Sequence, residues 1–254
     1  MVENRSHGGA RFESSPVADG GTPVETWTGW DRDVAPVDLG DCGGMTIVAP
    51  HPDDETLGLG ATIAMLCAAG VDVQVVSVSD GGAAYPGLSA ADRAQLEMVR
   101  RAEIRRSMGL LGAGAPIRLE MPDGELCRHE QQLTDRIAAL LADFPAGRWC
   151  AATWRGDGHP DHEAVGRASA AAAAQTGAVF LEYPVWMWHW ARPEDPSVPW
   201  NRARRVALTD NALNSKNAAV QCFTSQTRPG PDGRTVLPPA VVRRLLAVGE
   251  VVFV

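Results

Sequence analysis

Three acidic side chains follow a histidine in the stretch PHPDDE, residues 50–55. They come directly after residues 45–49, an apolar run with β-branched members that is typical of a buried strand. Adjacent carboxylates at the end of a buried strand are costly unless a positive charge neutralises them. A metal cation would do so, with His51 as a neighbouring ligand. The alternative is an acidic cap that faces the dipole of the following helix, with His51 an ordinary loop residue.

A second polar cluster lies at residues 156–163, GDGHPDHE. His159 and His162 are three residues apart at the expected start of a helix, so both point from the same end of its first turn. Each cluster follows an expected strand. In the commonest doubly wound sheets these two strands are neighbours, and ligands bind at their carboxyl-terminal ends. We therefore expect the two clusters to meet, although they are far apart along the chain.

Such a meeting would suit a hydrolytic metal site. Two histidines and one carboxylate are ligands of catalytic zinc, which keeps a further position open for water. Zinc lowers the pKa of that water to about 7 and polarises a carbonyl oxygen. His51 and His162 would be ligands together with one of Asp53 and Asp54, and the other carboxylate would accept a proton from water. His159 would stabilise an oxyanion or protonate the leaving group. The alternative for the histidine pair is a polar helix cap.

The surrounding sequence alternates between strand and helix patterns. Strands are expected at residues 45–50, 71–79, 116–121, 149–154, 179–183, 204–208 and 248–254, and helices at 56–69, 90–111, 131–143, 160–175 and 211–224. This alternation predicts an α/β fold, a doubly wound and mostly parallel sheet between two helical layers. We expect one domain at 41–254 after an N-terminal extension at 1–40. Trp27 and Trp30 are costly to leave in water, so we expect them to dock this extension against the domain.

Composition narrows the function classes. The formal net charge of -8 argues against nonspecific nucleic-acid binding and against a polyanionic substrate. No apolar run reaches the roughly 18 residues of a membrane-spanning helix, and the first residues lack the apolar core of a signal peptide. The five cysteines are far apart, with no CxxC pair. That spacing favours reduced thiols, so we expect a cytoplasmic protein.

The two polar clusters together resemble the motifs of the zinc-dependent N-acetylglucosaminyl de-N-acetylases, the PIG-L or LmbE-like family. Members carry (P/A)HPDDE, here residues 50–55, and HPDH, here residues 159–162. Weaker similarities are an R-x-x-E helix, a PDG loop and a closing K…SQ segment, here at residues 99–112, 121–126 and 214–226. The resemblance covers residues 45 to about 226 and leaves out the N-terminal extension.

This resemblance implies a Rossmann-like sheet and a role for each polar residue. The implied zinc ligands are His51, Asp54 and His162. Asp53 is implied as the general base and His159 as the group that stabilises the tetrahedral intermediate. Asp161 is implied to orient a histidine, which agrees with the usual pairing of carboxylates with metal-bound histidines. One zinc per chain is expected, and iron or another divalent ion is left open.

The activity implied is removal of an N-acyl group from an amino sugar, or from a related amide such as a thiol-sugar or natural-product conjugate. The expected partner is thus a small N-acetylated amino sugar or glycoconjugate, and an oligomer is left open. The tentative substrate contacts are Arg100, Asp80, Asp123 and Trp186. The alternatives are a surface ion pair of Arg100 with Glu103, ordinary turn residues for the two aspartates, and core packing for Trp186. The rival functions are a non-catalytic sugar-binding module and a two-metal phosphoesterase, which needs more carboxylate ligands.

Overall fold

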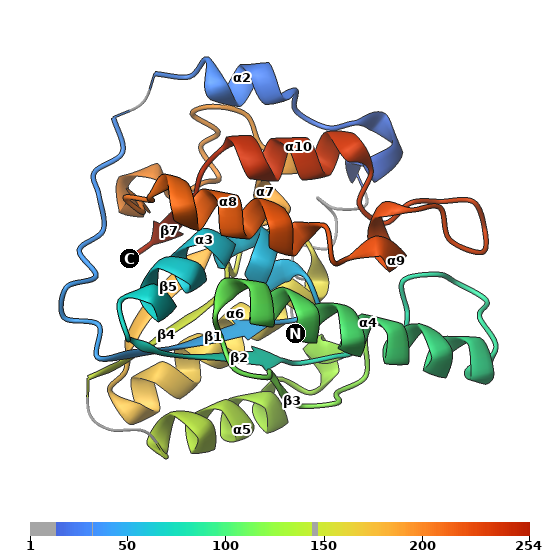
Figure 1. Ribbon diagram of the computed structural model, residues 1–254, viewed down its shortest axis with the longest axis horizontal. Helices are drawn as coiled ribbons and strands as arrows, with labels where there is room; N and C mark the ends of the chain where they lie inside the picture. The colour runs from blue at the N-terminus through green and yellow to red at the C-terminus, as the bar shows by residue number, and fades with distance from the viewer. Residues whose placement is uncertain (1–13, 32, 144–146) are drawn as a thin grey trace, which may run out of the picture.

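A twisted sheet runs through the centre of the molecule (Figure 1). The computed structural model describes residues 14–31, 33–143 and 147–254, and in these it has seven strands in the order β3-β2-β1-β4-β5-β7-β6. The strands are β1 (Gly44–Ala49), β2 (Asp72–Ser77), β3 (Ile117–Arg118), β4 (Arg148–Thr153), β5 (Val179–Tyr183), β6 (Ala203–Arg205) and β7 (Val251–Phe253). The first five are parallel, and β7 pairs antiparallel with β5 and β6. The predicted mostly parallel, doubly wound α/β fold is confirmed.

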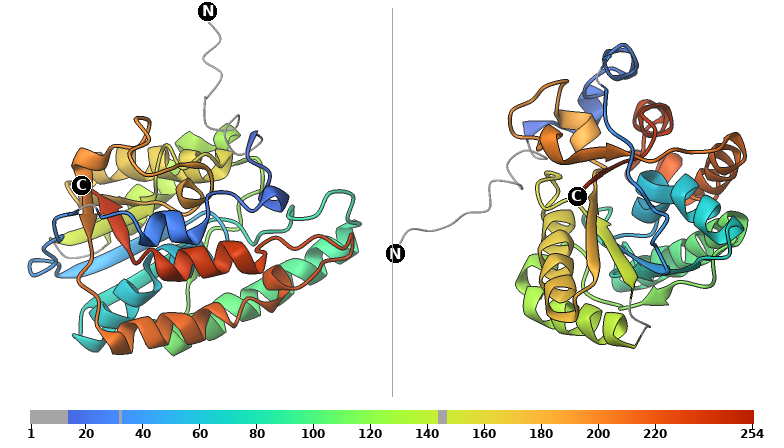
Figure 2. Two further views of the ribbon diagram at one scale, coloured as in Figure 1. Left: turned by 90° about the horizontal axis from the view of Figure 1, so that it is seen from above. Right: turned by 90° about the vertical axis from the view of Figure 1, so that its left-hand side faces the viewer.

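Helices cover both faces of the sheet (Figure 2). One face carries α5 (Glu130–Ala142) and α6 (Pro160–Thr176). The other carries α3 (Asp54–Ala68), α4 (Ala90–Leu111), α8 (Asp210–Val220) and α10 (Pro239–Ala247). The shorter helices are α2 (Val24–Thr28), α7 (Met187–Trp190), α9 (Thr224–Thr227) and the 3₁₀ turns η1 (Val17–Asp19), η2 (Leu126–Arg128) and η3 (Trp200–Arg202). Each helical layer packs its own apolar cluster against the sheet.

Local sequence signals explain the elements that were predicted most closely. All six residues of β1 are buried, as expected for a central strand covered on both faces. Helix α4 begins after Ser89, whose hydroxyl accepts a hydrogen bond from the Asp92 amide at 3.1 Å, and it ends at Gly112 with φ of 81°. Helix α6 likewise starts at Pro160 and ends before the left-handed Gly177.

The structure departs from prediction where long-range contacts decide the backbone. Strand β3 has two residues where 116–121 was expected, because Glu120 adopts a positive φ of 51° and interrupts the pleat. The helix expected at 211–224 ends at Val220, and α9 follows after a short break. Helix α10 was not predicted; it begins at two prolines and packs near α2 and α3.

The described part of the N-terminal extension packs against the domain, as its tryptophans predicted. Trp27 is 5% exposed, and its Nε1 donates to the Trp188 carbonyl at 3.0 Å. The rings of Trp30, Trp188 and Trp200 lie around it, with centroids 4.9 to 6.2 Å from its own. In Figure 1, α2 lies alongside α10, although the two helices are at opposite ends of the sequence. The extension is therefore part of the packed structure from about residue 14.

Two further findings concern membrane spans and cysteines. Within the described residues, no helix is both long and apolar enough to span a membrane. All five cysteines are described, and none forms a disulfide.

Candidate metal centre and active site

The two polar clusters meet at the carboxyl-terminal ends of β1 and β4, which are adjacent parallel strands. His51 lies in the loop that leaves β1, and His162 lies in the first turn of α6. Between them, Oδ2 of Asp54 is 3.1 Å from Nδ1 of His51 and 3.2 Å from Nε2 of His162. These three side chains place one donor atom each within 4.8 Å of one another. The geometry brings together the three residues predicted as metal ligands.

His162 shows directly how this group fits a cation. Its side chain is fully buried, and its Nε2 makes no hydrogen bond within the described part of the chain. Burial alone would lower the pKa of His162, but the carboxylates of Asp54 and Asp157 raise it to about 9. A buried ring nitrogen that faces a carboxylate without a hydrogen bond is the arrangement that a shared metal ion completes.

His51 stands in an equally negative environment. Burial would lower its pKa, but Asp123, Asp161 and Asp54 raise it well above the ordinary value. Its Nε2 lies 3.0 Å from Asp123 Oδ1 and 3.3 Å from Asp161 Oδ2. Burial would conversely raise the pKa of Asp54, and the histidine contacts lower it. Carboxylates outnumber positive groups at this end of the sheet, so a divalent cation suits the site electrostatically.

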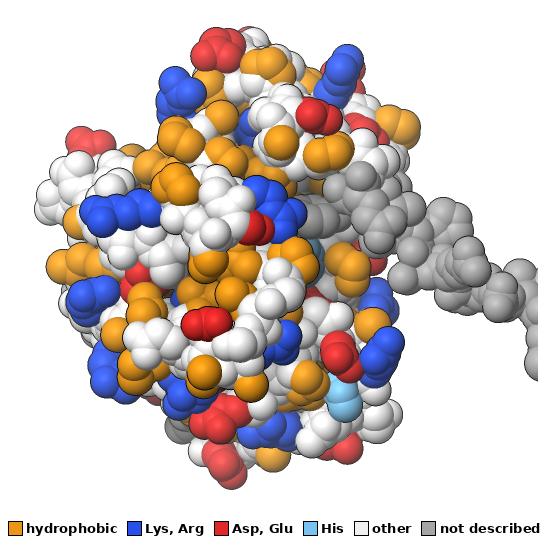
Figure 3. Space-filling view, turned by 90° about the vertical axis from the view of Figure 1, so that its right-hand side faces the viewer, with side chains coloured by type: hydrophobic (Ala, Val, Ile, Leu, Met, Phe, Trp, Pro, Cys, Tyr) orange, Lys and Arg blue, Asp and Glu red, His pale blue; other side chains and the backbone are white. Residues whose placement is uncertain are grey.

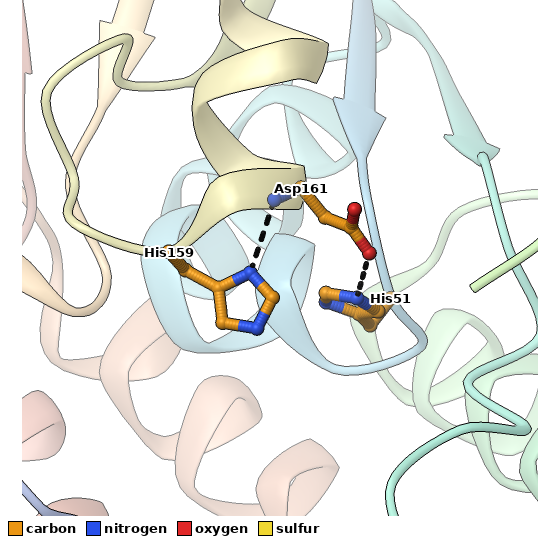
Figure 4. A group of neighbouring side chains, drawn as sticks. All are labelled: His51, His159 and Asp161. Carbon is orange, nitrogen blue, oxygen red and sulfur yellow. Dashed lines mark hydrogen bonds and ion pairs between the residues drawn. The ribbon is translucent and has the colours of Figure 1, made fainter. Parts of the chain in front are cut away.

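His51 also belongs to a second group of possible metal ligands. It combines His51, His159 and Asp161, and Figure 4 shows the two imidazoles approaching from the loop after β1 and from the start of α6. Asp161 is already engaged, because its carboxylate accepts from the amides of Gly124 at 2.8 Å and Leu126 at 3.1 Å. Nδ1 of His159 accepts from the Asp161 amide at 3.2 Å. Among the described residues, the carboxylate of the other group, Asp54, receives a single backbone hydrogen bond, from His51, so we take the group with Asp54 and His162 as the candidate metal site.

Asp53 precedes α3 in a strained backbone conformation. Its φ of 142° is rare for a residue with a side chain. The carboxylate of Glu55 accepts from its amide at 3.2 Å, and Gln226 donates to the carbonyl of Pro52. Asp53 is 5% exposed, and burial together with the Asp54 charge raises its pKa well above the ordinary value, against the opposing effect of Arg100. The surroundings thus hold a carboxyl group of raised basicity beside the candidate metal ligands.

Sequence reasoning missed Asp157, although it lies in the quoted stretch GDGHPDHE. This carboxylate is fully buried and lies 2.8 Å from Nδ1 of His162. It also accepts from the amides of residues 185, 186 and 187, each at 2.9 Å. A carboxylate on the far nitrogen of a metal-binding histidine fixes its tautomer and ring orientation. The family resemblance gave a role of this kind to Asp161, which contacts His51. A metal-binding His162 also needs a carboxylate on its second ring nitrogen, and this requirement could have pointed to Asp157.

A cavity of about 790 Å³ opens above these side chains. Asp53, Asp54, His51 and His159 line it, and so do three of the predicted substrate contacts, Arg100, Asp123 and Trp186. The structure does not bring Asp80 to this cavity. Both oxygens of Asp80 bind Arg118 on β3, at 2.8 and 2.9 Å, and one of them also binds Arg101 at 2.7 Å. Arg118 on β3, the strand next to β2, therefore neutralises the charge of Asp80 within the protein.

The alternative of a surface ion pair for Arg100 is wrong. Its side chain is 2% exposed, and Nη1 donates to the Gly81 carbonyl at 2.8 Å. Its Nε and Nη2 are buried and find no hydrogen-bond partner among the residues that the structure describes. Glu103 binds elsewhere, accepting from the Ser225 amide and hydroxyl at 2.8 and 2.6 Å. Arg100 thus lines the cavity and carries two donor nitrogens without a hydrogen-bond partner among the described residues.

Comparison with known proteins agrees with this geometry. Residues 46–173, half of the chain, match the PIG-L family, described as GlcNAc-PI de-N-acetylase. The chain belongs to the PIG-L family. It is thereby an amide hydrolase of the deacetylase class, and PIG-L deacetylases are metal-dependent enzymes. This identification confirms the resemblance seen in the two motifs.

Relatives with assigned names cover different shares of the chain. The 1D-myo-inositol 2-acetamido-2-deoxy-alpha-D-glucopyranoside deacetylase of Mycobacterium sp. (strain JLS) is 27% identical over 75% of this chain and 76% of its own length. Diacetylchitobiose deacetylase of Thermococcus kodakarensis is 28% identical over 50% of this chain, which spans 47% of that relative. A solved structure, a conserved protein from Thermus thermophilus, is 27% identical with a TM-score of 0.56, covering 79% of this chain and 84% of that one. The fold of this chain is thus shared with that solved structure.

Proposed function

We propose that this protein is a zinc-dependent hydrolase that removes an N-acetyl group from an amino sugar or a glycoconjugate of one. The observation that carries the proposal is the position of Asp54, whose Oδ2 lies within 3.2 Å of a nitrogen of both His51 and His162. Beside it, Asp53 lines a cavity of about 790 Å³, large enough for a sugar substrate.

The three ligands would be His51, Asp54 and His162, with one zinc per chain and another divalent ion as the alternative occupant. A bound ion of this kind supplies a Lewis acid that polarises the acyl oxygen and lowers the pKa of water. Asp157 would keep Nε2 of His162 available as a donor by holding the ring through Nδ1. Asp161 would hold His51 in the same way, at 3.3 Å from its Nε2.

The remaining residues of the site would carry the proton transfers. Asp53 accepts a proton from the attacking water while the water oxygen forms a bond to the acyl carbon. His159 stabilises the negative charge that develops on the acyl oxygen. The C–N bond then breaks, and the proton passes to the departing nitrogen. The products are acetate and a free amine, which balances the atoms of the amide and one water.

The named relatives support the substrate class. Their printed substrates, a 2-acetamido-2-deoxyglucopyranoside of inositol and diacetylchitobiose, both carry N-acetylated sugars. In this chain, the unpaired donors of Arg100 and the carboxylate of Asp123 would hold sugar hydroxyls, and Trp186 would lie against the ring. A thiol-sugar or natural-product amide is the alternative substrate on the same site. We place the enzyme in the cytoplasm, with residues 1–40 as an extension of the deacetylase domain at 41–254.

Release of primary amine tests the proposal. The zinc-loaded protein should release amine from N-acetylglucosamine or one of its glycosides, detected with an amine-reactive fluorophore. His51→Ala should bind less metal and lose this activity, which separates catalysis by the site from contamination. Equal rates in the two proteins, or no release from any N-acetylated amino sugar, would contradict the assignment. A protein that binds such sugars without hydrolysing them would instead be a non-catalytic binding module.

A further inference from the structure

Lys216 and Glu250 form an ion pair inside the protein. On the face shown in Figure 3, acidic and basic side chains are interspersed at the surface, where water solvates them. Lys216 on α8 and Glu250, which precedes β7, are instead only 2% and 3% exposed. Nζ of Lys216 donates to Oε1 of Glu250 at 2.9 Å. Helix α8 lies alongside α3, so the pair is buried next to the helix that begins at the candidate metal site (Figure 1).

Helix α3 contains a break, and Glu250 binds at that break. Leu59, inside α3, has φ of -134° and ψ of 21°, which are not helical values. Directly after it, the amides of Ala61 and Thr62 donate to the two carboxylate oxygens of Glu250, each at 2.8 Å. If a helix begins again after Leu59, these are its second and third amides, the two that a capping side chain satisfies. Glu250 therefore caps the second part of α3 from a distance of 189 residues along the chain.

Lys216 completes this cap. The carboxylate of Glu250 accepts from two amides, from the hydroxyl of Thr62 and from the ammonium group of Lys216, which neutralises its charge. A Cβ added at Gly60 would lie 3.1 Å from Cγ of Lys216, so the lysine stem packs directly against the break. Lys216 lies in the segment 214–226, which resembles the closing K…SQ segment of the family. The capping contact gives this lysine a structural partner in α3.

The part of α3 before the break belongs to the candidate active site. It begins with Asp54, a candidate metal ligand, and directly follows Asp53. A Cβ added at Gly58 would lie 2.3 Å from Cδ2 of Tyr183, so this part of the helix lies against that ring. The hydroxyl of Tyr183 donates to the Val48 carbonyl on β1 at 3.1 Å. The first part of α3 is thus fixed to the sheet on one side, and the break separates its direction from that of the rest of the helix.

The chemistry of the pair matches the needs of the break. Taking two charges out of water costs free energy, and well-packed apolar residues of the same volume often stabilise a fold as much or more. Apolar side chains, however, cannot accept hydrogen bonds from the backbone amides at the start of a helix. A carboxylate can accept them, and once buried it needs a positive partner. Stability alone therefore does not account for Lys216 and Glu250, whereas capping of a bent helix does.

We propose that Lys216 and Glu250 are positioning residues for the candidate metal site. By capping α3 at its internal break, the pair fixes the direction of the first turn of the helix. That direction sets the place of Asp54 between the two candidate histidine ligands. Neither Lys216 nor Glu250 lines the cavity, so both act on the site through α3. The inference rests on the proposed function, because it takes Asp54 as a metal ligand.

The variant Glu250→Gln in the full-length protein tests the inference. Glutamine keeps the size of the side chain but has one acceptor oxygen for the two amides of Ala61 and Thr62. Zinc affinity, measured by competition with a chromophoric chelator, should fall about tenfold or more, as when other groups that orient a metal ligand are lost. Co²⁺ binds such sites less tightly than zinc, and its visible absorption reports the geometry of its ligands. The spectrum of the Co²⁺-loaded variant should therefore differ from that of wild type.

A matched control separates positioning from a general loss of stability. Arg148 is 6% exposed and donates to Asp72 and Thr46, each at 2.8 Å, at the amino-terminal ends of the strands. Arg148→Met thus breaks a largely buried set of contacts at the end of the sheet opposite the candidate metal site. This variant should lower the melting temperature of the metal-free protein and keep the wild-type zinc affinity and Co²⁺ spectrum. An equal loss of zinc affinity in Arg148→Met and Glu250→Gln would overturn the inference.

The double variant Lys216→Met with Glu250→Gln keeps the test decisive if the single variant fails to fold. It removes both charges, so its melting temperature should return toward that of wild type. Its zinc affinity should stay reduced, because the amides at the break still lack the carboxylate.

Recovery of both the melting temperature and the zinc affinity in the double variant would show that the pair acts through stability alone. Wild-type zinc affinity and Co²⁺ spectrum in folded Glu250→Gln would likewise overturn the inference, while leaving the proposed function intact. A wild-type protein that binds zinc but releases no amine would instead contradict the proposed function. The comparison of zinc affinities needs no turnover, so it would still decide the role of Lys216 and Glu250.

Discussion

Oδ2 of Asp157 lies 2.8 Å from Nδ1 of His162, and neither side chain is exposed to solvent. Asp157 receives three backbone hydrogen bonds from residues 185–187 as well, so the segment after β5 holds it in place. The loop after β4, the turn after β5 and the first turn of α6 are joined through this one carboxylate. The orientation of His162, a candidate metal ligand, therefore depends on a residue outside the candidate ligand group.

This relationship predicts the behaviour of Asp157→Asn. An amide offers one acceptor oxygen in place of two and turns an NH₂ group toward existing donors, so His162 loses its fixed orientation. We expect zinc affinity to fall about 10- to 100-fold, measured by competition with a chromophoric chelator. The control is Asp135→Asn, an exposed aspartate on α5, which should keep the wild-type affinity. Wild-type affinity in Asp157→Asn would remove Asp157 from the site.

The variant Asp53→Asn tests whether Asp53 accepts the proton without binding the metal. The variant should keep its zinc, because Asp53 is not among the ligand group, and it should lose roughly 10² or more in kcat because the amide cannot accept the proton. Metal content by mass spectrometry and amine release on the same preparation check both halves. Near-normal turnover in a zinc-loaded sample would exclude Asp53 as the base.

The two histidines at the start of α6, His159 before the helix and His162 in its first turn, should respond differently to removal. His162→Ala should lose metal affinity and activity together, because Nε2 of His162 faces Asp54 in the preferred donor group. His159→Ala should keep the metal and lose about 10²- to 10³-fold in kcat, the range for one oxyanion-stabilising donor. Measured zinc content in each variant decides between the two donor groups. Loss of zinc from His159→Ala with retention in His162→Ala would favour the group with Asp161.

The acid stability of the fold should depend on Glu182 in β5. Burial raises the pKa of Glu182, but hydrogen bonds from Arg155 and Arg202 outweigh this and lower it below the ordinary value. A lowered pKa in the folded state stabilises the protein above the unfolded-state pKa of about 4.3, and this stabilisation is lost as pH falls through the lower folded-state pKa.

Glu182→Gln should therefore show a smaller loss of unfolding free energy than wild type between about pH 5 and pH 3. Urea denaturation at a series of pH values measures it. Glu125→Gln is the control, because Glu125 is half exposed and pairs with the exposed Arg128. Parallel pH profiles for wild type and Glu182→Gln would show that the buried ion pairs do not stabilise the fold in this way.

The sequence by itself determined the local elements and the chemistry at two strand ends. Residues 45–49 and 149–153 are apolar runs, and the glycines at 112 and 177 end their helices, because strand burial and helix caps depend on neighbouring residues. The order β1 next to β4 followed from the general rule for doubly wound sheets, and with it the meeting of His51 and His162. Fold class was available from these signals, whereas the family and the choice of Asp54 over Asp53 as a candidate ligand came from the resemblance of the two motifs.

Only the tertiary structure decided which histidine or arginine each aspartate contacts. Asp157 reaches His162 while Asp80 is neutralised by Arg118, and nothing in the spacing of those residues distinguishes the two aspartates. Helix α10 and the N-terminal segment likewise depend on contacts between the two ends of the chain, and β7 is placed by its pairing with β5 and β6. Such contacts combine residues that are distant in sequence, each with a weak local signal. Their pairing is set by packing and by the hydrogen bonds that buried groups must satisfy, so it emerges only once the chain is folded.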